Sequence, residues 1–80
     1  METIAKYNLA TKQQLNVVSR ATMGSGGEPI QEVKLEVAGL TVCSLETLKP
    51  VMKPEDYNDI EEYIEQIEEA NYLSLITFSN

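Results

Sequence analysis

The segment from Pro54 to Asn71 constrains the fold of this 80-residue chain most strongly, because its apolar residues recur at intervals of three and four. The members of this stripe are Tyr57, Ile60, Tyr63, Ile64, Ile67 and Ala70. On a helical wheel they span an arc of roughly 140°. Pro54 suits the first position of a helix, and Asn71 can end one in the left-handed conformation. The pattern predicts an amphipathic helix over about residues 54–70, with one face packed on a sheet.

Residues 31–37, QEVKLEV, alternate polar and apolar side chains, as an antiparallel strand does when one of its faces is buried. Ala38 and Gly39 interrupt this alternation, and the segment LTVC follows. If these two residues form a tight turn, Val37 faces Leu40 across a hairpin and the apolar face continues. A β-bulge is the alternative, because alanine is unusual at the first position of such a turn.

Residues 12–22 are compatible with two structures. Thr11 followed by Gln14 is a capping-box pattern, which would begin a helix at Lys12. The same residues also alternate in polarity and include β-branched side chains, which is typical of a strand. We favour the strand, since the glycine-rich segment GSGGEP, residues 24–29, then becomes the loop of a hairpin.

The C-terminal segment YLSLITF, Tyr72–Phe78, contains no charge and no proline. In an extended chain it would be apolar on both faces, and we favour a strand that is central in the sheet. The alternatives are a strand whose second face is covered and one that pairs across a dimer. The segment SLETLKPVMKP, residues 44–54, contains two prolines and can hold little more than one helical turn, capped by Ser44. Together these elements predict a single α+β domain over residues 1–80, in which a small antiparallel sheet is covered on one face by one main helix.

The chain carries 13 acidic and 6 basic residues and no histidine. Its net charge of −7 argues against direct binding to nucleic acid or to an anionic membrane, because both require clustered Lys and Arg. A basic protein surface fits the sign of this charge. Without histidine, the commonest general base and transition-metal ligand are missing. The single cysteine, Cys43, is expected to be a small packed residue in a strand. We therefore expect no enzymatic activity, no metal and no cofactor.

The predicted helix segment, residues 54–71, contains eight carboxylates and no Lys or Arg. Seven of them cover the outer face of the helical wheel and are the candidate partner-binding residues. They are Glu55, Asp59, Glu61, Glu62, Glu65, Glu68 and Glu69. Like charges four residues apart destabilise a helix by a few tenths of a kcal/mol per pair. This face is either a solvated surface that keeps a small protein soluble or a surface built for a basic partner.

In its size, acidity, absence of histidine and lone cysteine, the chain resembles small acidic inhibitors encoded by phages, of the anti-CRISPR or anti-restriction kind. Neighbouring carboxylates on a helix lie roughly 5–6 Å apart, similar to the phosphates along a nucleic-acid strand. We expect a non-enzymatic inhibitor or interaction module whose acidic helix binds a basic, nucleic-acid-binding protein. No apolar run is long enough for a signal peptide or a membrane span, which predicts a cytoplasmic protein, in the host cell if a phage encodes it. The alternative is a structural or assembly subunit that forms a homodimer or larger homo-oligomer by strand pairing.

Overall fold

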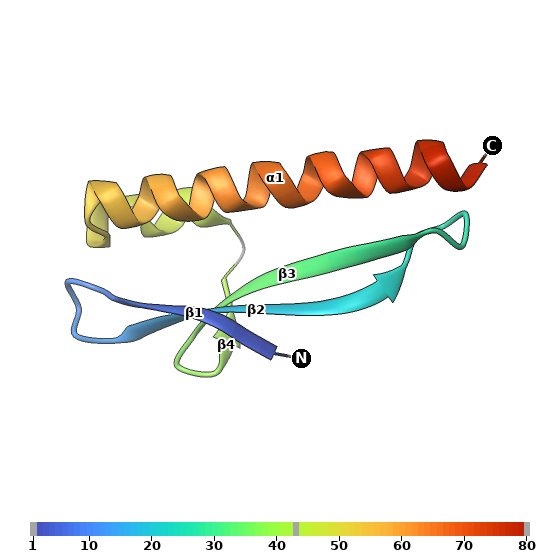
Figure 1. The fold of residues 1–80 in the computed structure, drawn as a ribbon. Coiled ribbons are helices and arrows are strands. Elements are labelled where there is room, and N and C mark those ends of the chain that lie inside the picture. The colour runs from blue at the N-terminus through green and yellow to red at the C-terminus, as the bar shows by residue number, and fades with distance from the viewer. Residues whose placement is uncertain (1, 43, 80) are drawn as a thin grey trace.

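The computed structural model describes residues 2–42 and 44–79, which form an antiparallel sheet followed by two helical segments (Figure 1). In chain order the elements are β1 (Glu2–Asn8), β2 (Gln14–Met23), β3 (Pro29–Val37), β4 (Leu40–Thr41), the 3-10 helix η1 (Leu45–Val51) and α1 (Pro54–Ser79). The strands lie side by side in the order β1-β2-β3-β4, and each neighbouring pair is antiparallel. Figure 1 shows α1 running along one face of this sheet. The predicted α+β architecture, with one main helix on a small antiparallel sheet, is confirmed.

Residues 14–23 form a strand, as favoured above, and not a helix begun by Thr11. β2 pairs with β3 in an uninterrupted register from Leu15 opposite Val37 to Met23 opposite Pro29. The intervening GSGGEP segment is a hairpin loop, in which the backbone N–H of Gly24 donates to the carbonyl oxygen of Glu28 at 2.8 Å. Long-range pairing with a second strand therefore outweighs the local capping signal.

The β3–β4 connection is a two-residue turn, the first of the two alternatives that the sequence leaves open, and not a bulge. Ala38 and Gly39 both adopt positive φ angles, 53° and 79°, as a type I′ hairpin turn requires. Val37 pairs with Leu40, and the N–H of Val42 donates to the carbonyl oxygen of Leu35 at 2.8 Å. Alanine is therefore held in the left-handed region, which costs an L-residue about 1 kcal/mol or more.

The edge strand β1 is an element that the sequence pattern does not predict. It pairs with β2 from Glu2 opposite Ser19 to Asn8 opposite Gln14, and the register shifts between Thr3 and Ala5. Such a shift is a β-bulge, which places one extra residue in β1. This extra residue breaks the simple polar–apolar alternation of ETIAKYN, so the periodicity of the strand is hidden in the sequence.

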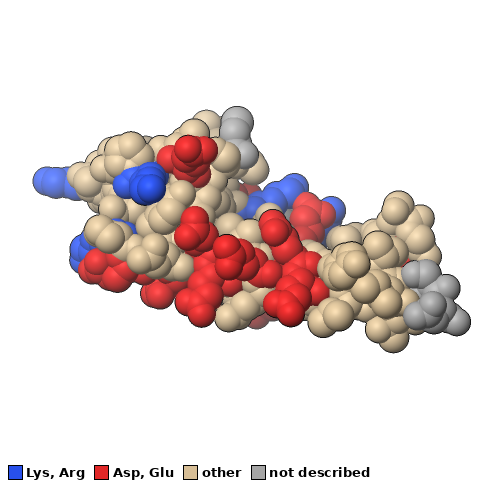
Figure 2. Space-filling model, turned by 90° about the horizontal axis from the view of Figure 1, so that it is seen from above, with Lys and Arg blue, Asp and Glu red and all other residues tan. Residues whose placement is uncertain are grey.

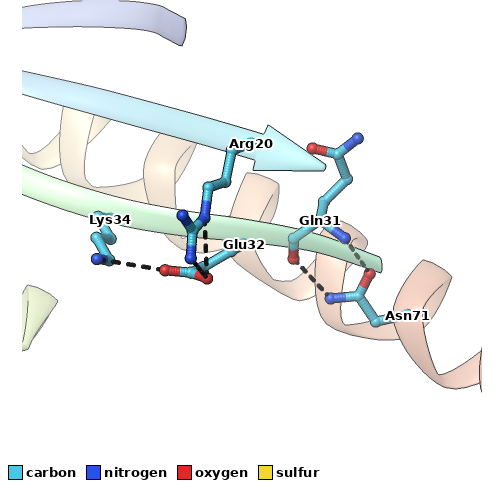
Figure 3. Close-up of polar contacts among 5 residues, drawn as sticks. All are labelled: Arg20, Gln31, Glu32, Lys34 and Asn71. Carbon is cyan, nitrogen blue, oxygen red and sulfur yellow. Dashed lines mark hydrogen bonds and ion pairs between the residues drawn. The ribbon is translucent and has the colours of Figure 1, made fainter. Parts of the chain in front are cut away.

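The prediction of a strand at Tyr72–Phe78 is wrong, because α1 continues without a break from Pro54 to Ser79. Asn71 does not end the helix either. Its side chain forms two hydrogen bonds with the backbone of Gln31 in β3 (Figure 3). The hydroxyl of Ser74 donates to the carbonyl oxygen of Pro29 at 2.6 Å. These contacts attach the last turns of the helix to β3, and tertiary contacts of this kind override the weak β preference of a short apolar segment.

The core lies between the sheet and the N-terminal half of α1. Its buried members are Leu9, Leu15, Val17, Leu35, Leu48, Met52 and Ile60. Leu15 and Ile60 are 0% and 1% exposed, so the predicted stripe on the helix does face the sheet. Tyr57, Tyr63 and Ile64 pack against this core while remaining partly exposed. Ile67 is also half-buried, whereas Ala70 is exposed.

The segment between the sheet and α1 forms η1, a 3-10 helix of seven residues, which is longer than the little more than one turn predicted. Ser44 occupies the N-cap position, as predicted, but its side chain makes no capping hydrogen bond. The hydroxyl of Thr47 instead donates to the carbonyl oxygen of Ser44 at 2.7 Å. Cys43 lies outside the described residues, so its predicted place in a strand stays a prediction.

Candidate protein-binding surface

The seven candidate carboxylates are all exposed side chains of α1. Figure 2 shows acidic side chains gathered in one band over the N-terminal and middle parts of this helix, while the C-terminal end of the helix is free of charge. The residues in the band are Glu55, Asp59, Glu61, Glu62, Glu65, Glu68 and Glu69. The structure therefore brings the predicted residues together on one element, and we call this surface the acidic band.

The acidic band is not uniform across its width. Glu68 borders a hollow formed with Gln31 and Val33, so it lies on the flank of α1 that faces β3. Asp59 lies on the opposite flank, since its charge acts on the hydroxyl of Tyr7 in β1. Between these two flanks, helical spacing places Glu62, Glu65 and Glu69 on the side of α1 that faces away from the sheet.

No carboxylate of the acidic band lies within ion-pair distance of a Lys or Arg in residues 2–42 and 44–79. The ion pairs in those residues join Glu32 of β3 to Arg20 at 3.1 Å and to Lys34 at 3.4 Å (Figure 3). The hydrogen bond from Arg20, followed by that from Lys34, lowers the pKa of the Glu32 carboxyl below its usual value. Glu32 and Lys34 alternate along β3 with Val33 and Leu35, whose side chains face the core. This cluster of charges therefore lies on the face of the sheet away from α1.

The charge of the acidic band thus stays without a partner inside the described chain. Glu61 and Glu65 are four residues apart, as are Glu65 and Glu69, and each like-charge pair destabilises the helix by roughly 0.2–0.5 kcal/mol. Glu68 and Glu69 also lie in the half of α1 toward its negative end, although the closing turns separate them from the terminus. The surface therefore carries an electrostatic cost that an alternating pattern of charges would avoid.

A groove runs between β1 and the flank of α1 that carries Asp59. Its volume is about 340 Å³, and it is lined by Ile4, Ala5, Tyr7, Val17, Ile60 and Tyr63. Burial, followed by the negative charges of Asp59 and Asp56, raises the pKa of the Tyr7 hydroxyl above its usual value. The groove is missed by sequence reasoning, because β1 itself is not predicted. The sequence does contain the two tyrosines that line the groove, Tyr7 and Tyr63, and Tyr63 is a member of the predicted helical stripe.

The C-terminal end of α1 forms a second, uncharged surface. Its exposed apolar side chains are Tyr72, Leu73, Leu75, Ile76 and Phe78. A shallow hollow of about 500 Å³ lies beside them, bordered by Pro29 of β3 and by Ala70, Leu73, Ser74, Thr77 and Phe78. We call this surface the apolar helix end. It begins where the acidic band stops, so the two surfaces follow each other along one helix (Figure 2).

In the part of the chain that the structure describes, no three His, Cys, Asp or Glu side chains gather in a way that could hold a metal ion. The described helices include none that combines the length and the apolar character needed to cross a membrane. No family model matches this chain, and no curated protein or solved structure matches it significantly.

Proposed function

We propose that this protein is a non-enzymatic inhibitor that binds the basic surface of a nucleic-acid-binding protein through the acidic band, in the manner of phage anti-CRISPR or anti-restriction proteins. It acts in the cytoplasm of the host cell. The observation that carries the proposal is the run of seven exposed carboxylates on one helix, none of them ion-paired within the described residues. A rigid row of negative charge fits a groove that is built to hold phosphates.

The energetic cost of the acidic band supports the same proposal. Solubility needs net charge, but it does not need that charge to be concentrated on one helix face, where it destabilises the fold. A basic partner removes this repulsion when it binds, because its Lys and Arg side chains neutralise the band. Complementary charge also speeds association, and this steering weakens as salt rises.

The test is affinity capture from host-cell lysate, followed by measurement of binding to the captured protein. The triple variant Glu62→Lys/Glu65→Lys/Glu69→Lys reverses the charge on the side of α1 away from the sheet. We expect it to abolish binding and to leave the fold intact, because these side chains are exposed. We also expect the wild-type protein to compete with nucleic acid for its target, and the complex to weaken as NaCl is raised.

The matched control is Glu2→Lys/Glu36→Lys/Glu46→Lys, which makes the same change in net charge at positions outside α1. This control should bind the target nearly as well as the wild type. Equal loss of binding in both triple variants would mean that only net charge matters. Unchanged binding in the helix variant would contradict the proposal, since the partner would then use another surface.

A second candidate function is assembly with further copies of the same chain, and the apolar helix end favours it. The radius of gyration is 14.0 Å, whereas about 11–12 Å is typical of a compact domain of this length. The strand pairing considered above cannot use Tyr72–Phe78, because these residues are helical. Light scattering during size-exclusion chromatography tests this candidate: a stable homo-oligomer that binds no basic protein would favour it over the inhibitor.

A further inference from the structure

We propose that the groove between β1 and α1 binds one arginine side chain of the basic partner, so that the protein recognises a specific cationic residue and not charge alone. This inference rests on the proposed function and names the group on the partner that the surface takes. It depends on three features of the described residues: the shape of the groove, its aromatic walls and the charge on its rim.

The groove exists because α1 does not lie centrally on the sheet. The helix packs mainly against β3, where Asn71 and Ser74 bind backbone groups of Gln31 and Pro29. This placement covers the β3 side of the sheet and leaves the β1 side open beneath the opposite flank of the helix. The bulge in β1 contributes to the opening. It inserts one extra residue between Thr3 and Ala5. This residue, Ile4, lines the groove beside Ala5.

The interior of the groove is apolar and two of its walls are aromatic. Val17 and Ile60 form its base, as they are almost completely buried, while Tyr7 of β1 and Tyr63 of α1 are half-buried. Such a channel accommodates the aliphatic stem of a long side chain. A tyrosine ring also attracts a cation within about 6 Å of its centroid. The chain already contains one contact of this type, in which the ammonium group of Lys49 lies 5.6 Å from the ring centroid of Tyr57.

The rim of the groove is negatively charged. Asp56, Asp59 and Tyr63 are three and four residues apart, so they form one row along the flank of α1 that faces β1. Both aspartates act on the Tyr7 hydroxyl and raise its pKa, although burial is the larger cause. Among the Lys and Arg residues, Lys6 is the nearest in sequence to the residues of β1 that line the groove. It alternates with Ala5 and Tyr7 along β1, and the side chains of those two residues face the core, so Lys6 lies on the other face of the strand.

These features select arginine among possible occupants. Its aliphatic stem can lie along Ile4 and Val17, while its planar guanidinium stacks on a tyrosine ring and bonds to a carboxylate. A lysine would keep the charge but lose the stacking and the bidentate geometry. A second copy of this chain is a poor occupant, because it brings a net charge of −7 to an already acidic rim.

The test uses ¹⁵N–¹H correlation spectra of the full chain and two peptides, acetyl-Gly-Ser-Arg-Ser-Gly-amide and the same peptide with citrulline in place of arginine. Citrulline keeps the shape of arginine and removes its charge. We expect the arginine peptide to shift the amide signals of Ile4, Ala5 and Tyr63 in a saturable way. The citrulline peptide should bind about tenfold more weakly, since it loses the charged contacts.

Two variants separate the groove from general acidity. Asp59→Asn removes one rim charge, and Glu36→Gln makes the same change in net charge on a sheet position away from α1. The first variant should weaken binding of the arginine peptide several-fold, and the second should leave it unchanged. Equal binding of the two peptides, or equal effects of the two variants, would overturn the proposal.

The site of the spectral shifts distinguishes this inference from the proposed function. Shifts confined to residues 61–69, with none at Ile4 or Ala5, would mean that arginine binds only the acidic band. This result would contradict the proposed groove and would leave the proposed inhibitor function unaffected. Shifts at Ile4 and Ala5 combined with target capture that survives the triple reversal on α1 would support the groove and contradict the acidic band as the binding surface. Shifts that appear on raising protein concentration without peptide would mean that a second copy fills the groove, which also overturns the inference.

Discussion

The side-chain amide of Asn71 in α1 forms two hydrogen bonds with the backbone of Gln31 in β3 (Figure 3). Its Oδ1 accepts from the N–H of Gln31 at 2.9 Å, and its Nδ2 donates to the carbonyl oxygen of the same residue at 2.9 Å. Within the described residues, β4 pairs with the last two residues of β3, Glu36 and Val37, and leaves the outer edge at Gln31 without a neighbouring strand. Asn71 therefore supplies, at the outer edge of β3, the pair of hydrogen bonds that a neighbouring strand would make, and it protects that edge from pairing with another chain.

We predict that Asn71→Ala lowers the free energy of unfolding by about 1–2 kcal/mol, because it removes two hydrogen bonds that attach α1 to β3. The control is Asn58→Ala, an exposed position earlier on the same helix. That substitution should be neutral or slightly stabilising, since alanine is the better helix former. Urea unfolding followed by circular dichroism measures both variants. Equal effects at the two positions would mean that the Asn71 contacts contribute nothing to stability.

The same asparagine explains where sequence reasoning fails in this fold. Asn71 next to an uncharged, partly β-branched segment has the pattern of a helix end followed by a strand. Whether the segment continues as helix depends on Gln31 and Pro29, which lie about forty positions earlier and are recognised only when β3 is in place beneath the helix. Local pattern gives the start of α1 at Pro54 correctly, and also the stripe from Tyr57 to Ile67 that faces the sheet, because both depend on residues within the helix itself.

The β3–β4 turn differs from this case, because the two residues Ala38 and Gly39 suffice to name a tight turn as one of two alternatives. Ala38 has a φ angle of 53°, a conformation that asparagine adopts more readily than alanine. We predict that Ala38→Asn raises the free energy of unfolding by about 0.5–1 kcal/mol. Ala70→Asn is the control, because it places the same substitution at an exposed position in α1, where it should cost about 0.5 kcal/mol. Thermal melts of the two variants should therefore move in opposite directions; a lower melting temperature for Ala38→Asn would contradict the prediction.

The acidic band makes a prediction about salt. Its carboxylates repel one another without an ion-pair partner in the described residues, and dissolved ions screen this repulsion. We predict that the melting temperature of the isolated protein rises between low and moderate NaCl concentrations. The response should be smaller in Glu62→Lys/Glu65→Lys/Glu69→Lys, which replaces repulsion by attraction between turns. Sulfate is unsuitable, since it stabilises proteins by exclusion whatever their charges. A melting temperature that stays constant or falls in NaCl would count against the repulsion.

The acidic band and the groove differ in how well they can be predicted from one segment of the sequence. All seven carboxylates of the acidic band could be placed from helical periodicity, since charge on an exposed helix face needs no other element to position it. The groove beside it could not be placed in this way. It joins Ile4 and Tyr7 of an edge strand to Ile60 and Tyr63 of the helix, residues more than fifty positions apart. Only the off-centre packing of α1 brings these two groups to one place.

The helical state of the C-terminal segment changes the expected effect of charge there. In a central strand, a lysine in place of Leu75 or Ile76 would unfold the monomer. In the helix, the Ile76 side chain is 42% exposed, so a charge there can remain in water. We predict that Ile76→Lys leaves a folded monomer within about 1 kcal/mol of the wild type. Ile60→Lys, the same substitution in the same helix at a position 1% exposed, should abolish folding, because it buries an unpaired charge in the core. Circular dichroism and light scattering on both variants check this contrast. Unfolding by Ile76→Lys would contradict this prediction. Conversion of a wild-type dimer to a folded monomer by the same change would show that a second copy covers the apolar helix end, and it would favour the assembly function over the inhibitor.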